Sequence, residues 1–214
     1  MMRPLLKYCG NKNEEDLKIT SQSAASYLGF VFVPGVKREV RPSDVKQWLS
    51  KHPNSKNKKL VALFVNATID EIQHVISQLP IDVIQCHGTE SPETVANIRA
   101  KTGVRVWKAI HHQLNGRTEM TRYAGIADGY VIDAKVSGQW GGTGQTFDWK
   151  AVPEYISEGK RQRVPVFIAG GVDTSNVKQL LAYQPDGIDL SSGLEVNGEK
   201  STEIITQFEG VVCK

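Results

Sequence analysis

Short runs of β-branched and apolar residues recur along the chain, and longer segments with helically spaced apolar residues lie between them. Such runs, bounded by polar residues, predict buried strands, and the segments between them predict amphipathic helices. The pattern predicts eight strands: Leu5–Tyr8, Leu28–Val33, Leu60–Val65, Val83–Gln85, Arg105–Ala109, Gly129–Ile132, Val166–Ala169 and Ile188–Leu190.

Capping residues support the predicted helix starts, because a side-chain oxygen at the N-cap satisfies a free backbone N–H group. Asn13 precedes a helix over Glu14–Ala25, and Ser91 followed by Pro92 precedes one over Glu93–Lys101. The other predicted helices are Asp44–Lys51 behind Ser43, Ile69–Gln78 behind Thr68, a short helix within Gln113–Ala127, Asp148–Glu158, Ser175–Tyr183 behind Thr174, and Ser201–Gly210.

Strands that alternate with helices fit either a closed parallel barrel or a doubly wound open sheet. An open dinucleotide-binding sheet has its glycine-rich turn after the first strand, where this chain has only Cys9-Gly10-Asn11. The glycine-rich turns follow the last two strands instead, as they do in phosphate-binding barrels. Residues 1–214 are therefore predicted to form a single α/β domain, a (β/α)₈ TIM barrel.

Composition and charge exclude several classes of partner. The net charge is +3, and the two basic runs, Lys56–Lys59 and Lys160–Arg163, fall in predicted loops without interleaved aromatic residues, so no nucleic-acid partner is expected. No apolar run is long enough to cross a membrane, and the N-terminus lacks the pattern of a signal peptide. The three cysteines are widely spaced and odd in number, which favours reduced thiols and a cytoplasmic location.

Two turns rich in glycine and serine follow the seventh and eighth predicted strands. In Ala169–Thr174, paired glycines let backbone N–H groups approach an anion, and the next helix contributes its positive N-terminal end. Asp189–Gly193 adds hydroxyl groups and further N–H groups. Either turn alone could be an ordinary tight turn with a cap. Together, at these two strands, they predict a phosphate-binding cup.

The ends of the first and sixth strands carry candidate acid–base groups. Cys9 stands where barrel enzymes place catalytic residues, although a buried core cysteine is the alternative and Cys86, at the end of the fourth strand, is a competitor. Cys213 is expected to be inert. Asp133 ends an apolar strand, where a charge needs a reason: a catalytic acid, an ion pair with Lys135, or a helix cap.

Further candidates lie in loops. Arg38 follows the second strand and could hold a carboxylate with two hydrogen bonds, or it could be a solvated surface residue. The glycine-rich segment 139–144 suits a lid over the barrel mouth or a plain flexible loop. The sequence predicts no metal site, because His52, His74, His111 and His112 show no ligand spacing.

These motifs together resemble, nearly from end to end, the phosphoribosylanthranilate isomerases, barrel enzymes of tryptophan biosynthesis. The chain departs from the common pattern at Asn11, Val36 and Cys86, where that family often has isoleucine, serine and leucine. The motifs that carry the resemblance are Lys7–Gly10, Gly29–Phe32, Lys37–Arg38, Leu63–Asn66, Gln85–Gly88, Asp133, Gly141–Gly144, Thr146–Trp149, Ala169–Gly171 and Asp189–Gly193.

The resemblance implies an Amadori rearrangement of N-(5-phosphoribosyl)anthranilate. Asp133 would be the general acid toward the furanose oxygen, Cys9 the general base toward the proton on C2′, and Arg38 the partner of the anthranilate carboxylate. No cofactor is implied, because the substrate nitrogen serves as the electron sink. The partner would be this phosphorylated small molecule, and the protein a monomer or homodimer. The other implied substrate-binding residues are His87, Gly142, Gly170, Gly171, Asp189, Ser191, Ser192 and Gly193.

This chemistry needs a protonated carboxyl group and an ionised thiol, whereas the pKa of free cysteine is about 8.5 and that of free aspartate about 3.9. We therefore expect burial around Asp133 and positive charge or N–H groups around Cys9.

Three other functions were weighed against this one. An aminoimidazole carboxamide ribotide isomerase would be expected to carry aspartate where Cys9 stands. A pentose-phosphate epimerase would have histidine and carboxylate metal ligands at strand ends. A non-catalytic sensor of phosphoribosyl ligands would need neither Cys9 nor Asp133.

Overall fold

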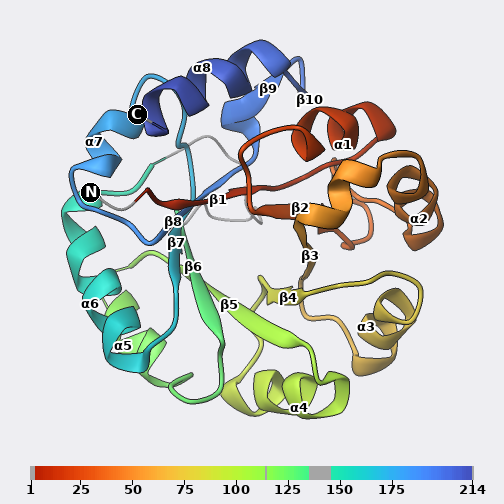
Figure 1. The fold of residues 1–214 in the computed structure, drawn as a ribbon. Helices are drawn as coiled ribbons and strands as arrows, with labels where there is room; N and C mark the ends of the chain where they lie inside the picture. Colours follow the sequence, from red (N-terminus) through yellow and green to blue (C-terminus); the bar gives the residue numbers. More distant parts are fainter. Residues whose placement is uncertain (1–2, 114, 135–145, 214) are drawn as a thin grey trace.

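A computed structural model describes residues 3–113, 115–134 and 146–213. Parallel strands close into a barrel in chain order, with β1 paired to both β2 and β8, and helices surround it (Figure 1). The predicted barrel is confirmed. Its strands are β1 Leu5–Tyr8, β2 Tyr27–Val31, β3 Lys59–Phe64, β4 Val83–Cys86, β5 Arg105–His111, β6 Gly129–Asp133, β7 Val166–Ile168 and β8 Gly187–Leu190.

A helix follows each barrel strand. A short antiparallel hairpin of β9 (Glu195–Val196) and β10 (Glu199–Lys200) lies between β8 and the last helix. Within the described residues, no helix combines the length and the apolar character needed to cross a membrane. The α-helices are α1 Glu14–Ser21, α2 Pro42–Lys51, α3 Ile69–Ile76, α4 Pro92–Thr102, α5 Gly116–Thr121, α6 Val152–Gln162, α7 Val177–Leu181 and α8 Thr202–Val212, and the 3₁₀ turns are η1 Pro53–Asn57, η2 Trp149–Ala151 and η3 Ser192–Leu194.

Three predicted caps are confirmed, because the side chains of Asn13, Thr68 and Ser91 each accept a hydrogen bond from the first turn of their helix. Ser201, expected as the first residue of the last helix, is instead its N-cap. At Thr68 the neighbouring Glu71 completes a capping box.

Two other predicted caps are wrong. Ser43 lies inside α2, because Pro42, whose φ angle suits the first helical position, starts that helix one residue earlier. Thr174 does not cap α7: the Asp173 side chain holds the N–H groups of Ser175 and Asn176 in a turn, and the helix begins only at Val177. The basic residue Lys160, expected in a loop, belongs to the last turn of α6.

Alternation along each strand divides the apolar core into two layers. On β4, Val83 belongs to the cluster inside the barrel, whereas Ile84 and Cys86 belong to the larger cluster between barrel and helices. Gln85 is fully buried and, by the same alternation, faces the interior. The interior cluster contains Tyr27, Val61, Val83, Trp107, Ala109, Val131, Phe167 and Ala169.

Candidate functional site

A cavity of about 520 Å³ lies at the carboxyl ends of the barrel strands. Every described residue that the sequence placed in the site lines it. Gly142 and the segment 139–144 lie outside the described residues. The lining residues are Cys9, Val31, Val33, Val36, Lys37, Arg38, Leu63, Val65, His87, Asp133, Ala169, Gly170, Gly171, Val172, Asp189, Leu190, Ser191, Ser192 and Gly193.

Cys9 directly follows β1 and is buried beside three cations. Lys7, Arg38 and Lys200 each interact electrostatically with Cys9. Burial is the largest influence on the pKa of each cation and acts to lower it, whereas the attraction to Cys9 acts to raise it. Gly29 provides the space for the thiol, since a Cβ atom at that position would lie 2.7 Å from Sγ. Positive charge therefore lies around Cys9, as the sequence led us to expect.

Lys7 is held inside the barrel by Asp189. Its Nζ donates a 2.8 Å hydrogen bond to Asp189 Oδ2, and neither side chain is appreciably exposed. Burial acts to lower the pKa of Lys7, but attraction to Asp189 and Cys9 outweighs it and raises that pKa. Lys7 and Asp189 thus form a buried ion pair, and Lys7 interacts with Cys9 as well.

Cys86 is not a competitor for the role of Cys9. Its side chain packs in the layer between barrel and helices and does not line the cavity. Burial raises the pKa of the Cys86 thiol to about 12. Cys213 is exposed at the end of α8, away from the cavity.

Asp133 is the last residue of β6 and is 4% exposed, which matches the burial expected for it. Its Oδ2 lies 3.2 Å from Nε2 of His87. Its Oδ1 faces the glycine turn after β7, because a Cβ atom added to Gly170 would lie 2.9 Å from that oxygen. Lys135, the alternative ion-pair partner, lies outside the described residues.

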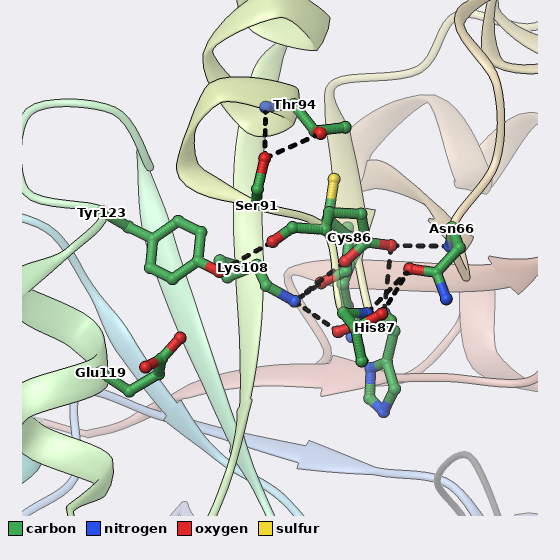
Figure 2. A network of polar contacts seen from close by, with 12 residues as sticks. Asn66, Cys86, His87, Ser91, Thr94, Lys108, Glu119 and Tyr123 are labelled. Carbon is green, nitrogen blue, oxygen red and sulfur yellow. Dashed lines mark hydrogen bonds and ion pairs between the residues drawn. The ribbon is translucent and has the colours of Figure 1, made fainter.

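The loop that carries His87 is anchored by a buried ion pair. Lys108 Nζ donates to Glu90 Oε2 at 2.9 Å and to the carbonyl oxygens of Gly88 and Cys86 on either side of His87. Figure 2 shows this network, with the His87 imidazole extending away from it. The ion pair therefore fixes the backbone while the imidazole reaches the cavity.

His87 and Asp133 also lie close to His111, which the sequence left unassigned. Possible metal-binding atoms of the three residues lie within 4.8 Å of one another, and the His87 and His111 rings contact edge to face. Burial and the neighbouring His87 lower the pKa of His111. His87 and Asp133 are also hydrogen-bonded to each other. Because the three residues could hold a metal ion, the absence of a metal site stays a prediction.

Arg38 is held at the cavity by the β9–β10 hairpin. Its guanidinium donates two hydrogen bonds to Glu195, which also accepts one from Lys200. Lys200 in turn donates to the carbonyl oxygen of Ser191, which links the hairpin to the turn after β8. Gly10, at φ 75°, leaves space for Arg38, because a Cβ atom there would collide with the Arg38 side chain. Arg38 is therefore not a solvated surface residue.

The two predicted phosphate turns lie against each other. Gly170 and Gly171 have φ angles of 83° and 60°, which glycine adopts readily. The N–H group of Gly171 has no hydrogen-bond partner within the part of the chain that the structure describes. Gly193 packs so closely on the Val172 carbonyl that no Cβ atom fits. The helix N-terminus that was expected beside the glycines is not there, because α7 starts only at Val177 and has 5 residues.

Sequence reasoning missed residues that act through distant contacts. Lys7 and Gly29 both stand in motifs that the sequence analysis names. Lys7 lies two positions before Cys9, so strand alternation turns both side chains to the same face, and Gly29 lies on the neighbouring strand. This placement is a usable signal that both residues lie near Cys9. Glu195 follows the serine–glycine turn after one intervening residue. Nothing in the sequence indicated that Lys200 or His111 would lie beside the site.

A closed parallel barrel whose strand ends surround a cavity with a thiol, a buried carboxyl group and two glycine turns defines a (β/α)₈-barrel enzyme. A family model described as N-(5'phosphoribosyl)anthranilate (PRA) isomerase matches residues 6–211. The chain belongs to this family of isomerases. An N-(5'-phosphoribosyl)anthranilate isomerase from Halalkalibacterium halodurans is 53% identical over 208 residues, which cover 97% of this chain and 94% of that protein.

Solved structures of the family have the same fold. Monomers of a dimeric phosphoribosylanthranilate isomerase from Thermotoga maritima are similar, with a TM-score of 0.78, 28% identity and coverage of 96% of both chains. A phosphoribosyl anthranilate isomerase in complex with reduced 1-(o-carboxyphenylamino)-1-deoxyribulose 5-phosphate gives a TM-score of 0.79, 26% identity and the same 96% coverage of both chains.

Proposed function

We propose that this chain converts N-(5-phosphoribosyl)anthranilate into 1-(2-carboxyphenylamino)-1-deoxyribulose 5-phosphate, a step of tryptophan biosynthesis. The observation that carries the proposal is that the acid, the base, the carboxylate partner and both phosphate turns line one cavity of about 520 Å³. That volume is typical of small-molecule sites.

The two anionic ends of the substrate would bind to different groups of lining residues. Gly170, Gly171 and the turn Ser191–Gly193 would hold the phosphate with backbone N–H groups and hydroxyls. Arg38 would hold the anthranilate carboxylate, and the apolar side chains that line the cavity with it would contact the aromatic ring. These apolar residues are Val31, Val33, Val36, Leu63 and Val65.

Asp133 and Cys9 would divide the proton transfers. Asp133 donates its proton to the furanose ring oxygen while the bond from C1′ to that oxygen breaks, and the substrate nitrogen becomes an iminium. Cys9, as the thiolate, removes the proton from C2′, and those electrons form the enolamine that tautomerises to the ketone. Each transfer contributes about 10²- to 10⁴-fold in rate. Lys7, Arg38 and Lys200 supply the positive charge beside Cys9, and the iminium nitrogen makes a cofactor unnecessary.

The partner is this phosphorylated small molecule, and Asp189, His87 and Gly142 complete its binding residues. The proposal also keeps one domain over residues 1–214, a cytoplasmic location, and a monomer or a homodimer. The Thermotoga maritima relative is dimeric.

The test follows the fluorescence of anthranilate derivatives while the labile substrate is generated in place. We expect turnover by the wild-type protein, loss of at least about 10²-fold in kcat for Cys9→Ala and for Asp133→Asn, and unchanged turnover for Cys213→Ala, a matched thiol control far from the cavity. Folding is checked by circular dichroism. No turnover by the folded wild-type protein refutes the function, and near-normal kcat in either site variant removes that residue from its role.

A further inference from the structure

A buried amide lies behind the histidine that contacts Asp133. Gln85, on β4, has no exposed surface, and its Nε2 lies 2.9 Å from Nδ1 of His87. The other ring nitrogen of His87, Nε2, lies 3.2 Å from Oδ2 of Asp133. The three side chains thus form one line from the barrel interior to the end of β6.

The chemistry of the three groups fixes where the protons lie. With the amide nitrogen of Gln85 facing the ring, its NH₂ group donates and Nδ1 of His87 accepts, so in this arrangement Nδ1 carries no proton. A neutral imidazole then has its proton on Nε2, and that N–H group points at Asp133 Oδ2. The backbone at His87 is held in place, because Lys108 binds the carbonyl groups on both sides of His87.

We propose that Gln85 is a positioning residue for the general acid: it holds His87 in the tautomer whose Nε2–H group donates to Asp133. This inference rests on the proposed function, because it concerns the acid of that reaction. Gln85 itself does not line the cavity.

The arrangement gives the two oxygens of Asp133 different tasks. Oδ2 accepts from His87, so the proton to be transferred sits on Oδ1, beside Gly170 at the cavity. When that proton moves to the furanose oxygen, the negative charge left on the carboxylate strengthens the hydrogen bond from His87. The bond is therefore stronger in the transition state than before it, which accelerates proton donation.

The first experiment needs no variant. The ¹⁵N chemical shifts of the imidazole nitrogens are measured in wild-type protein labelled at its 5 histidines, and His87 is assigned from the signals missing in His87→Gln. We expect a neutral ring with the proton on Nε2. A ring protonated on Nδ1 alone, or on both nitrogens, overturns the proposal, because the amide then accepts from His87 instead of donating to it.

The second experiment removes the amide with Gln85→Leu, which is similar in size. The control is Gln78→Leu, because Nε2 of Gln78 also contacts a histidine ring nitrogen, Nε2 of His74 at 3.0 Å, but on the exposed surface of the protein. In Gln85→Leu we expect kcat to fall at least about 10-fold, a part of the ~10²–10⁴-fold supplied by a general acid, with little change in KM. The control keeps wild-type kcat.

A third measurement separates positioning from damage. The affinity for reduced 1-(o-carboxyphenylamino)-1-deoxyribulose 5-phosphate depends on the two anionic ends of the ligand and not on proton transfer, so it should be unchanged in Gln85→Leu. Unchanged kcat, or an equal loss of kcat and of affinity, overturns the proposal. If wild-type protein showed no isomerase turnover at all, the proposed function would fail first, and the histidine tautomer would still test the hydrogen-bond geometry.

Discussion

Arg38 and Glu195, 157 residues apart in the sequence, form a two-point ion pair at the rim of the cavity. Nε and Nη2 of Arg38 donate to the two carboxylate oxygens of Glu195 at 2.9 and 2.8 Å. A bidentate pair fixes the direction of the guanidinium as well as its place. Lys200 binds the same carboxylate at 3.0 Å, so the hairpin supplies two of the three charges of this cluster.

Glu195→Gln should therefore weaken substrate binding more than chemistry. The amide keeps one of the two hydrogen bonds to Arg38 and loses the charge, so the guanidinium is less well directed. We expect KM to rise about 10-fold, which corresponds to about 1.4 kcal/mol, with kcat within about threefold of wild type. Steady-state kinetics measures both. The exposed hairpin residue Glu199, changed to glutamine, is the matched control, and a KM that stays equal or falls contradicts the role given to Glu195.

Glu90→Gln should destabilise the fold, because it leaves the buried Lys108 without its anionic partner. The side chains of both residues are at most 3% exposed, and breaking a buried ion pair costs about 3–5 kcal/mol. The exposed pair of Glu15 and Lys18 is the control, and Glu15→Gln should cost less than about 1 kcal/mol. Urea denaturation at pH 7 measures both. Equal losses in the two variants would contradict a structural role for the Lys108 contact.

The contribution of the Glu90–Lys108 pair to the free energy of unfolding should depend on pH. Burial acts to raise the pKa of Glu90, but Lys108 and the Asn66 backbone N–H group outweigh it and hold that pKa below the usual 4.5. Because the folded pKa is the lower one, the stabilisation is present above the unfolded pKa and is lost as pH falls through the folded value. Denaturation between pH 7 and pH 3 measures the free energy of unfolding of wild type and of Glu90→Gln. The difference between the two should narrow below about pH 4.5. A constant gap contradicts this.

The three thiols should differ in reactivity. Iodoacetamide at pH 8 should alkylate the exposed Cys213 and the cavity residue Cys9, whereas Cys86, with a pKa of about 12 and 1% exposure, should stay unmodified. Loss of turnover should follow Cys9 labelling, measured by peptide mass spectrometry. Cys213→Ser should be inactivated at the wild-type rate. Inactivation that follows labelling of Cys86 would refute the choice between the two buried thiols.

Gly29→Ala should impair the base. Its methyl group would lie 2.7 Å from Sγ of Cys9 and 3.1 Å from the Cys9 Cα atom, so the thiol must move. We expect a loss of at least about 10-fold in kcat and of about 1–3 kcal/mol in stability from the overpacking. In Gly210→Ala the new methyl group meets nothing within 4 Å, in the interior of α8. That control should keep full activity and gain about 0.5–1 kcal/mol. Similar kcat values for both variants would contradict the close packing.

Local sequence patterns were sufficient to predict the strands and helices of the barrel. The strand β1 has the predicted bounds, and the other strands differ from prediction by one or two residues at one end or, in β2 and β3, at both ends. Caps were predictable where one side chain satisfies the first turn, as at Ser91. The errors at Ser43 and Thr174 arose where a neighbour, Pro42 or Asp173, competes for the helix start.

The site was predicted in part from position along the strands and in part from family resemblance. Composition and spacing left Cys9 and Cys86 as alternatives. Alternation on β4 decides between them in the folded barrel, since Cys86 faces the helices. For Asp133 the sequence offered a catalytic acid or, as alternatives, an ion pair with Lys135 or a helix cap, and gave no sign of the contact with His87, 46 residues away.

The sequence by itself determined the order of strands and helices, the strand ends at which functional residues stand, and the glycine turns. These features depend on the spacing of apolar residues, on helix capping and on backbone freedom within a few residues. Only the tertiary structure decided which side chains meet: Gln85 with His87 and Asp133, Lys7 with Asp189, and Arg38 with Glu195 and Lys200. Most of these partners come from strands and loops far apart in the chain. They make contact because the barrel closes β8 onto β1 in one register and brings the carboxyl ends of all its strands to the same rim.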